Sequence, residues 1–194
     1  MVYYTYDEMD YIRNLCLVRL FFLHNCRLDI LMLVNIKGST KTTRKLVESA
    51  VWDYAERMMS TRLVKTLVLN INLIRNYNEK EGCEGSCIWD YWDDLKKTPR
   101  EFTIELDSSI SIRNILINLA HEMVHVKQWV KGEMYEYSSN SNMVRFLKKK
   151  YDMNDIDYYD YPWEIEAFGR QLGLFVRWCE SNGFGDRNDM KETA

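Results

Sequence analysis

The feature that most constrains this chain is the stretch from residue 111 to residue 132, which carries His121, Glu122 and His125 in an H-E-x-x-H pattern. Apolar residues recur there at steps of three and four, which predicts a helix with one side in a core. They are Ile112, Ile115, Leu116, Leu119, Met123, Val126 and Val130. On a helix the two imidazoles lie one turn apart on one face, where they can bind one metal ion together. Glu122 is rotated by about 100° from His121, so its carboxylate is expected beside that ion.

A second, polar stripe runs along the same predicted helix at steps of four and three. It consists of Asn114, Asn118, His121, His125 and Gln128. Exposed helix faces usually carry lysine and glutamate, whereas this one carries amides and imidazoles, so we expect it to form the floor of a cleft. The alternative is a chance match on an exposed helix with two solvated histidines. The chain has only three histidines, and two of them fall at ligand spacing, which favours a metal site.

Composition restricts the class of protein. A chain of 194 residues, 46% of them hydrophobic, is long enough for one folded domain with a core. The net charge of −3 gives no basic footprint, so no nucleic-acid partner is expected. Five cysteines, an odd number, indicate reduced thiols in a cytoplasm, and Cys83 and Cys87 lack the second Cys/His pair of a structural zinc site. Polar residues interrupt the apolar run 15–36, so no membrane span is expected. Acidic residues precede the run where a signal peptide carries positive charge, so no signal peptide is expected either.

The remaining pattern predicts an α+β fold, in which a small sheet packs against the H-E-x-x-H helix and a following helix that bears glutamate completes the cleft. The predicted strands are 31–37, 62–74, 101–107 and a short one at 133–137. The predicted helices are 42–59 and one from Pro162 to about residue 179. Residues 76–100 are expected to form a long loop, and residues 144–151 a solvated face. The domain organisation follows as a helical N-terminal extension (1–31), one domain (32–181) and a flexible C-terminal tail (182–194).

A catalytic zinc usually has three protein ligands, and no further histidine follows His125. The helix that starts at Pro162 offers Glu164 and Glu166, which point about 200° apart, so only one of them can face the ion. Glu164 shares its face with the small residue Ala167, which would allow close helix packing, and is therefore favoured. Glu166 has Arg170 at i+4 for a surface ion pair, and it stays as the alternative ligand.

Two segments together, HEMVHVKQW at residues 121–129 and YPWEIEAFGR at residues 161–170, resemble the paired motifs of the gluzincin metallopeptidases. The closest resemblance is to the small single-domain phage and prokaryotic members called minigluzincins, and it covers about residues 31–179. In such families an E-x-x-A motif supplies the glutamate ligand, which implies Glu164 here. Many relatives continue with an aspartate that braces a histidine ligand. This chain has Phe168 at that position, so the partners that orient its imidazoles must come from elsewhere.

The resemblance implies a zinc-dependent metallopeptidase acting on a peptide or protein substrate in the cytoplasm, that of the host if the chain is phage-encoded. Zn²⁺ is expected on His121, His125 and Glu164, with Glu122 as general base. Tyr158, Tyr159 and Tyr161 are the candidate hydrogen-bond donors to the oxyanion. A catalytically silent metal-binding interaction protein or virion accessory protein is the alternative, although a structural zinc has no need of Glu122. A nucleic-acid-linked protease would need a basic patch, for which residues 148–150 alone give little support.

Overall fold

The computed structural model describes residues 32–89, 98–137 and 142–191. The predicted N-terminal extension (1–31) and the last three residues of the predicted tail lie outside the described residues. Within them the fold is α+β, as the sequence predicts. No helix in the described ranges combines the length and the apolar character needed to cross a membrane.

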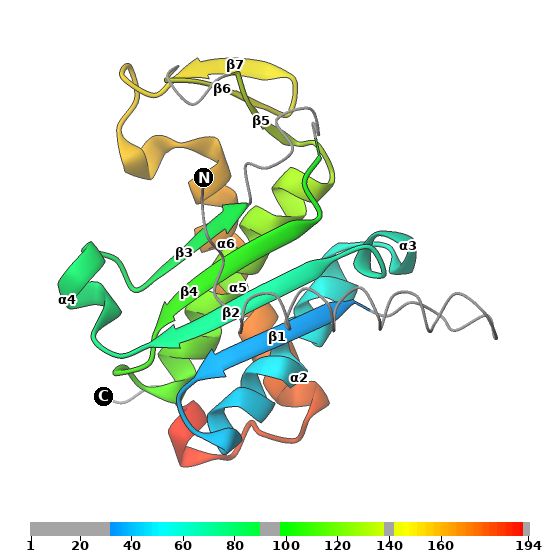
Figure 1. The fold of residues 1–194 in the computed structure, drawn as a ribbon, viewed down its shortest axis with the longest axis vertical. Coiled ribbons are helices and arrows are strands. Elements are labelled where there is room, and N and C mark those ends of the chain that lie inside the picture. Colours follow the sequence, from blue (N-terminus) through cyan, green and yellow to red (C-terminus); the bar gives the residue numbers. More distant parts are fainter. Residues whose placement is uncertain (1–31, 90–97, 138–141, 192–194) are drawn as a thin grey trace, which may run out of the picture. The chain divides into compact units, whose positions relative to one another are not determined.

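The main sheet has four strands in the order β1-β2-β4-β3 (Figure 1). The strands β1 (Leu33–Gly38), β2 (Val68–Ile74) and β4 (Glu101–Asp107) are parallel to one another, and β3 (Gly85–Trp89) pairs antiparallel with β4. The strands β1 and β4 confirm two predictions. Because β4 lies between β2 and β3, it has no free edge, and the strand available for further pairing at that side of the described sheet is β3.

Side chains alternate across this sheet as the period of two requires. Leu69, Ile71 and Leu73 of β2 are buried against the helices. The opposite face is polar, with an amide hydrogen bond from Asn35 Nδ2 to Asn70 Oδ1 of 3.0 Å. One face of the sheet is therefore built for the core and the other for water.

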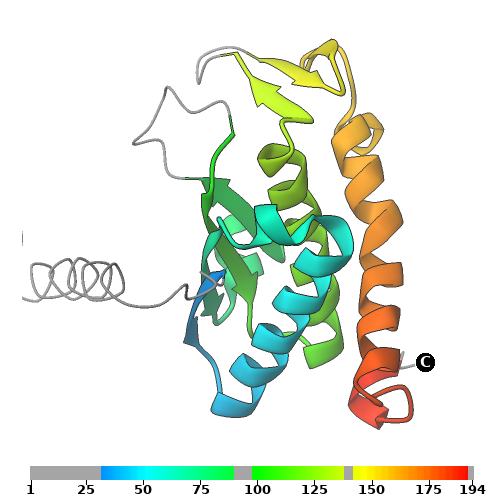
Figure 2. The same cartoon turned by 90° about the vertical axis from the view of Figure 1, so that its right-hand side faces the viewer.

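Three long helices lie on the apolar side of the sheet (Figure 2). They are α2 (Lys41–Met58), α5 (Ile112–Val130) and α6 (Pro162–Ser181), all close to their predicted bounds. Helices α2 and α5 form the layer next to the strands, and α6 packs outside them (Figures 1 and 2). The H-E-x-x-H helix α5 is thus enclosed between the sheet and α6.

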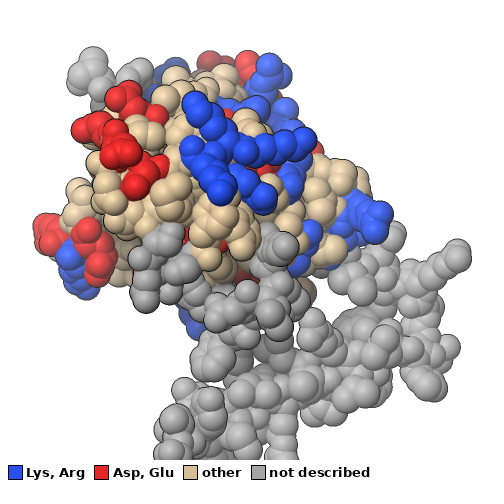
Figure 3. Space-filling view, turned by 90° about the horizontal axis from the view of Figure 1, so that it is seen from above, with Lys and Arg blue, Asp and Glu red and all other residues tan. Residues whose placement is uncertain are grey.

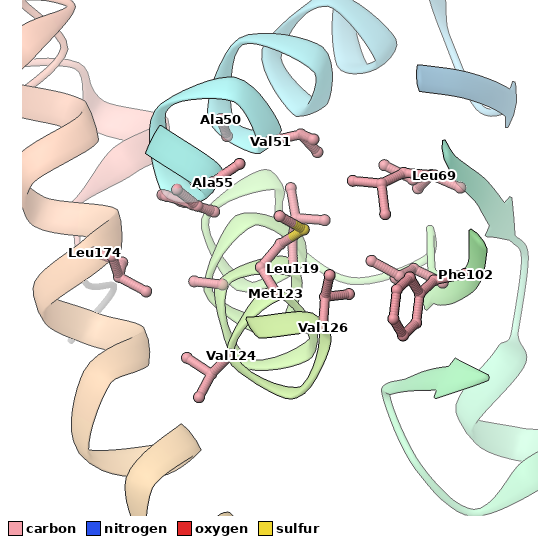
Figure 4. Close-up of a cluster of buried hydrophobic side chains, with 14 of the residues drawn as sticks. Ala50, Val51, Ala55, Leu69, Phe102, Leu119, Met123, Val124, Val126 and Leu174 are labelled. Atoms are coloured by element: carbon pink, nitrogen blue, oxygen red, sulfur yellow. The ribbon is translucent and has the colours of Figure 1, made fainter. Parts of the chain in front are cut away.

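The apolar stripe of α5 is the centre of the core (Figure 4). Leu119, Met123 and Val126 point from α5 toward Phe102 of the sheet and toward α2, and all four are fully buried. Burying side chains of this size contributes about 1.5–3 kcal/mol each. The core thereby fixes the rotation of α5 and leaves its polar stripe facing out of the core.

A second sheet follows α5, with the strand order β5-β6-β7. It consists of β5 (Met134–Glu136), which confirms the predicted short strand, β6 (Met143–Phe146) and β7 (Lys149–Asp152). The solvated face predicted for residues 144–151 is therefore partly wrong, because this segment is a hairpin whose Val144 and Phe146 are buried. Viewed from this side of the molecule, the largest group of Lys and Arg side chains lies beside a group of Asp and Glu side chains, and further charged side chains lie at the margins (Figure 3).

Two other segments differ from their predictions. The first part of the predicted strand 62–74 is a short helix, α3 (Thr61–Val64), which is followed by a turn, and the strand begins only at Val68. The predicted loop 76–100 contains α4 (Tyr77–Glu81) and β3. Strand β3 has no apolar alternation, since it lies at the edge of the sheet and lines a cavity.

The described part of the predicted C-terminal tail comprises residues 182–191. A 3₁₀ helix, η3 (Asn188–Met190), follows α6, and Met190 is buried in the core. Phe184 also packs against Trp178, with the ring centroids 5.2 Å apart. Two apolar side chains in a polar stretch give no sequence periodicity by which to predict this segment.

Candidate metal centre

The N-terminal cap of helix α5 and the packing of its apolar face fix the positions of both histidines. The side chain of Ser111 caps the helix by accepting a hydrogen bond from the Asn114 backbone N–H (3.2 Å). With the apolar stripe in the core, His121 and His125 face α6, which approaches closely because Ala167 at the contact is small and fully buried. This close approach is the one the sequence predicts.

Three ligand atoms meet between α5 and α6. His121 Nε2 lies 3.2 Å from His125 Nε2, and the two nitrogens lie 3.2 Å and 3.5 Å from Glu164 Oε2 and Oε1, respectively. Two ligands on a tetrahedral ion with bonds of roughly 2.0–2.2 Å are roughly 3.3–3.6 Å apart. The three side chains therefore have the separations of one face of such a tetrahedron, which leaves a fourth position for another ligand. His121, His125 and Glu164 could hold a metal ion.

The tautomer of His125 follows from a buried amide. Gln128 is fully buried, and its Nε2 donates to the backbone carbonyl of Trp163 (2.9 Å) and to Glu166 Oε2 (3.1 Å). Both partners are acceptors only, so the NH₂ group must face them and Oε1 must face His125 Nδ1, 2.9 Å away. His125 Nδ1 then carries the proton, and the lone pair of Nε2 is free for a metal ion.

His121 is braced by an amide in the same way. Its Nδ1 lies 2.9 Å from Gln171 Oε1, and the ring of Phe168 packs on it with the centroids 4.7 Å apart. Phe168 thus contacts the ring without a hydrogen bond, and Gln171 one turn further along α6 supplies the acceptor. With both Nδ1 atoms protonated, the two Nε2 atoms and the carboxylate face one another favourably only with a cation among them, which is either a metal ion or the proton of an imidazolium whose Nε2 donates to Glu164.

Burial and hydrogen bonding act in opposite directions on Glu164. Its burial alone would raise the pKa, but hydrogen bonds to His121 and His125 outweigh that effect and lower the pKa of Glu164 below its ordinary value. For His125, burial alone would lower the pKa, and the hydrogen bond to Glu164 raises it overall. The carboxylate is therefore held in the charged form that a metal ligand requires.

Glu122 lies beside these ligands and is not one of them, as the helix geometry predicts. It is buried and lines the same cavity, and its carboxylate makes no hydrogen bond to another described residue. Burial raises the pKa of Glu122, partly offset by His125 and His121. Gly85 of β3 passes so close that a Cβ there would lie 3.0 Å from Glu122 Oε1. A side chain at position 85 would therefore displace the carboxylate.

Glu166 is excluded as a ligand by its own contacts. Its Oε1 accepts from Lys127 Nζ (2.7 Å) and from Arg170 Nε (2.8 Å), and its Oε2 accepts from Gln128. The ion pair with Arg170 is the predicted one. The contacts with Lys127 and Gln128 were not predicted, and they place Glu166 behind His125 as a support for the amide that orients it.

Of the three tyrosine candidates, only Tyr158 lines the cavity. Its hydroxyl donates to Glu164 Oε2 (2.9 Å), and burial followed by the charge of Glu164 raises its pKa, which keeps the phenol protonated. The Tyr161 hydroxyl donates to the Met153 carbonyl instead, and Tyr159 is 74% exposed.

The cavity has a volume of about 250 Å³ and opens to solvent. It is lined by Gly85, Ser86, Cys87, Trp89, His121, Glu122, His125, Trp129, Met134, Glu136, Tyr158, Trp163 and Glu164. Neither Cys83 nor Cys87 belongs to the metal-capable group, and among the described residues the group at His121 is the one that forms. The sequence predicts the floor of this cavity, whereas the walls formed by β3 and β5 depend on strand pairing and were not predicted.

The amides of Gln171 and Gln128, which contact the two imidazoles, were given no role by the sequence reasoning. A signal existed for both, because Gln128 belongs to the polar stripe of α5 and Gln171 lies on the Glu164 face of α6.

No protein-family model, no curated protein and no solved structure matches this chain. The resemblance to gluzincins therefore rests on the two motifs and stays a prediction.

Proposed function

We propose that this protein is a zinc-dependent peptidase that uses Glu122 as its general base. The observation that carries the proposal is the convergence of His121, His125 and Glu164 on one point, with the Glu122 carboxylate beside them in the same cavity and bound to no other described side chain. A site that only stabilised the fold would have no use for a buried carboxylate in that position.

Zinc fits the donor set better than harder cations do. Two imidazole nitrogens and one carboxylate oxygen with an open fourth position are the usual ligands of a catalytic zinc. Magnesium and calcium prefer six or more oxygen ligands, which this site does not offer. The protonated Nδ1 atoms that Gln128 and Gln171 hold would orient both imidazoles toward the ion.

The residues divide the chemistry between them. A zinc ion held there would act as a Lewis acid on the scissile carbonyl and on the attacking water. Glu122 takes the proton from that water and delivers it to the leaving amine, a role for which its raised pKa is suited. The Tyr158 hydroxyl, now bonded to Glu164, donates to the oxygen of the carbonyl as negative charge develops on it.

The edge strand β3 suggests how a peptide is held. Its inner side pairs with β4, and Gly85, Ser86, Cys87 and Trp89 line the cavity. An extended peptide could add to the other side of β3 through main-chain hydrogen bonds. Main-chain pairing of this kind would hold the peptide across the cavity with its carbonyl groups near Glu122.

The test uses the full chain, made metal-free and then reloaded with zinc, and a random peptide library read by mass spectrometry. We expect the wild type to bind one zinc and to cleave, and Glu122→Gln to bind zinc equally while cleaving at least about 10²-fold more slowly. The matched control is Glu56→Gln, the same change at an exposed site on α2. A wild type that holds stoichiometric zinc and cleaves no member of the library would overturn the peptidase and favour the silent metal-binding protein.

A further inference from the structure

One wall of the cavity is built from strand β5 and three tryptophans. Met134 and Glu136 line the cavity, whereas Tyr135 between them lies on the opposite face of the small sheet, with Arg145 5.0 Å above its ring. The alternation of the strand therefore directs the Glu136 side chain into the cleft. Trp89, Trp129 and Trp163 line the same cavity.

No cation among the described residues pairs with Glu136. It makes no ion pair or hydrogen bond with any described residue, and its neighbour across the strand pair is Val144. Burial raises the pKa of Glu136, so the carboxylate is partly removed from water without compensation. Nearby cations lie over tyrosine rings instead: Lys150 is 5.1 Å from the ring centroid of Tyr137 and Lys149 is 5.0 Å from that of Tyr151.

The charge of the cavity lining also favours binding of a cation near Glu136. Its described lining includes the carboxylates Glu122, Glu136 and Glu164 and no lysine or arginine. The charge of a divalent ion would be offset by Glu164 and Glu122. The Glu136 carboxylate is then the uncompensated charge of the cleft, and a bound cation would stabilise it.

The aromatic neighbours favour an organic cation over a metal ion at this position. Trp89 and Trp129 contact each other with ring centroids 3.9 Å apart, and Trp163 is stacked on Tyr161. Indole faces attract ammonium and guanidinium groups and also bury the methylene stem of lysine or arginine. A lone carboxylate offers a metal ion too few ligands.

We propose that Glu136 and these tryptophans form a subsite for a cationic side chain, so that the cleft selects peptides with lysine or arginine close to the bond to be cleaved. This inference rests on the proposed peptidase function and names its substrate class. Glu136 is the specificity-determining residue, and the tryptophans hold the stem of the bound side chain.

Binding is measured first, so that the subsite is tested apart from turnover. The zinc-loaded Glu122→Gln chain is titrated with paired peptides that differ only by lysine against norleucine, and tryptophan fluorescence reports binding. We expect the lysine peptide to bind at least about tenfold more tightly, with the difference shrinking at high salt. Adding Glu136→Gln should abolish the difference. Adding Glu136→Lys should reverse it, so that a third peptide with aspartate at the same position binds more tightly than the lysine peptide. The control is Asp155→Asn, an exposed carboxylate that does not line the cavity.

Cleavage of the library by the wild type then separates the two claims. Cleavage without any preference for lysine or arginine, together with equal binding of the paired peptides, overturns the subsite and leaves the peptidase standing. A lysine preference in binding that Glu136→Gln removes, in a wild type that cleaves nothing, supports the subsite and overturns the peptidase. A lysine preference that survives in Glu136→Gln overturns the assignment to Glu136.

Discussion

Replacing Gln128 by methionine removes both ends of the amide that links α6 to His125 while keeping a side chain of similar length. His125 Nδ1 loses its acceptor at 2.9 Å, and the Trp163 carbonyl and Glu166 lose a donor. Because Gln128 is fully buried, water cannot take over these bonds. The imidazole is then free to rotate or to adopt the other tautomer, in which Nε2 carries the proton and cannot bind a metal ion.

The size of the effect can be bounded. Loss of a partner that orients a metal-bound imidazole typically weakens metal affinity by about 10–100-fold, or about 1.4–2.7 kcal/mol. Orphaned buried polar groups cost about 1–3 kcal/mol in the free energy of unfolding. The matched variant is Gln171→Met, which removes the acceptor of His121. Gln171 is only partly buried, so a water molecule can replace its oxygen, and a smaller loss is expected.

Zinc affinity is measured by competition with a chromophoric chelator, and the free energy of unfolding of the metal-free chains by urea denaturation. Nitrogen-15 NMR at alkaline pH should show the Nδ1–H tautomer of His125 in the wild type and a mixture of tautomers in Gln128→Met. A Gln128→Met chain that binds zinc as tightly as the wild type would contradict this role of Gln128. A larger loss of zinc affinity in Gln171→Met than in Gln128→Met would contradict it as well.

Three further predictions test other parts of the account. Tyr158→Phe should reduce kcat by about 10²–10³-fold with zinc content unchanged, as measured by steady-state cleavage; an unchanged kcat would remove Tyr158 from the chemistry. Asp107 accepts from the backbone N–H groups of Asn78 (2.8 Å) and Ser109 (2.7 Å); burial alone would raise its pKa, but these bonds lower it. Its contribution to stability is therefore present above the unfolded pKa of about 3.9 and lost as the pH falls below it, so the acid limb of a urea-derived stability profile should flatten in Asp107→Asn. Leu119→Ala, at a fully buried position of α5, should lower the free energy of unfolding by about 2–5 kcal/mol in urea, and a loss below about 1 kcal/mol would contradict the packing.

The helices and strands that could be predicted from the sequence are those whose apolar residues recur at a regular local spacing. The bounds of α5 follow from its apolar stripe, and β4 follows from the alternation of Phe102, Ile104 and Leu106. Glu164 was preferred to Glu166 because the small residue Ala167 lies on the same helix face. A small residue at that spacing predicts a close contact with another helix, and local spacing alone is enough to see it.

The parts that could not be predicted depend on pairing between distant segments. Strand β3 is defined by its register with β4, and its own residues carry no alternation. The β6–β7 hairpin turns through Leu147 and Lys148, both with positive φ, where the usual glycine or asparagine is missing. The contacts of Gln128 depend on how α5 crosses α6, and the position of Glu136 depends on the register of β5. Neither can be predicted from one segment of the sequence.

The most direct test of the central claim is the metal content of four purified chains after zinc loading: the wild type, His121→Ala, Glu164→Ala and Glu166→Ala. The account predicts one zinc in the wild type, none in His121→Ala and Glu164→Ala, and one, bound more weakly, in Glu166→Ala because Gln128 loses its support. Zinc retained by Glu164→Ala and lost from Glu166→Ala would contradict the assigned ligand. A wild type that binds no metal would contradict the site itself.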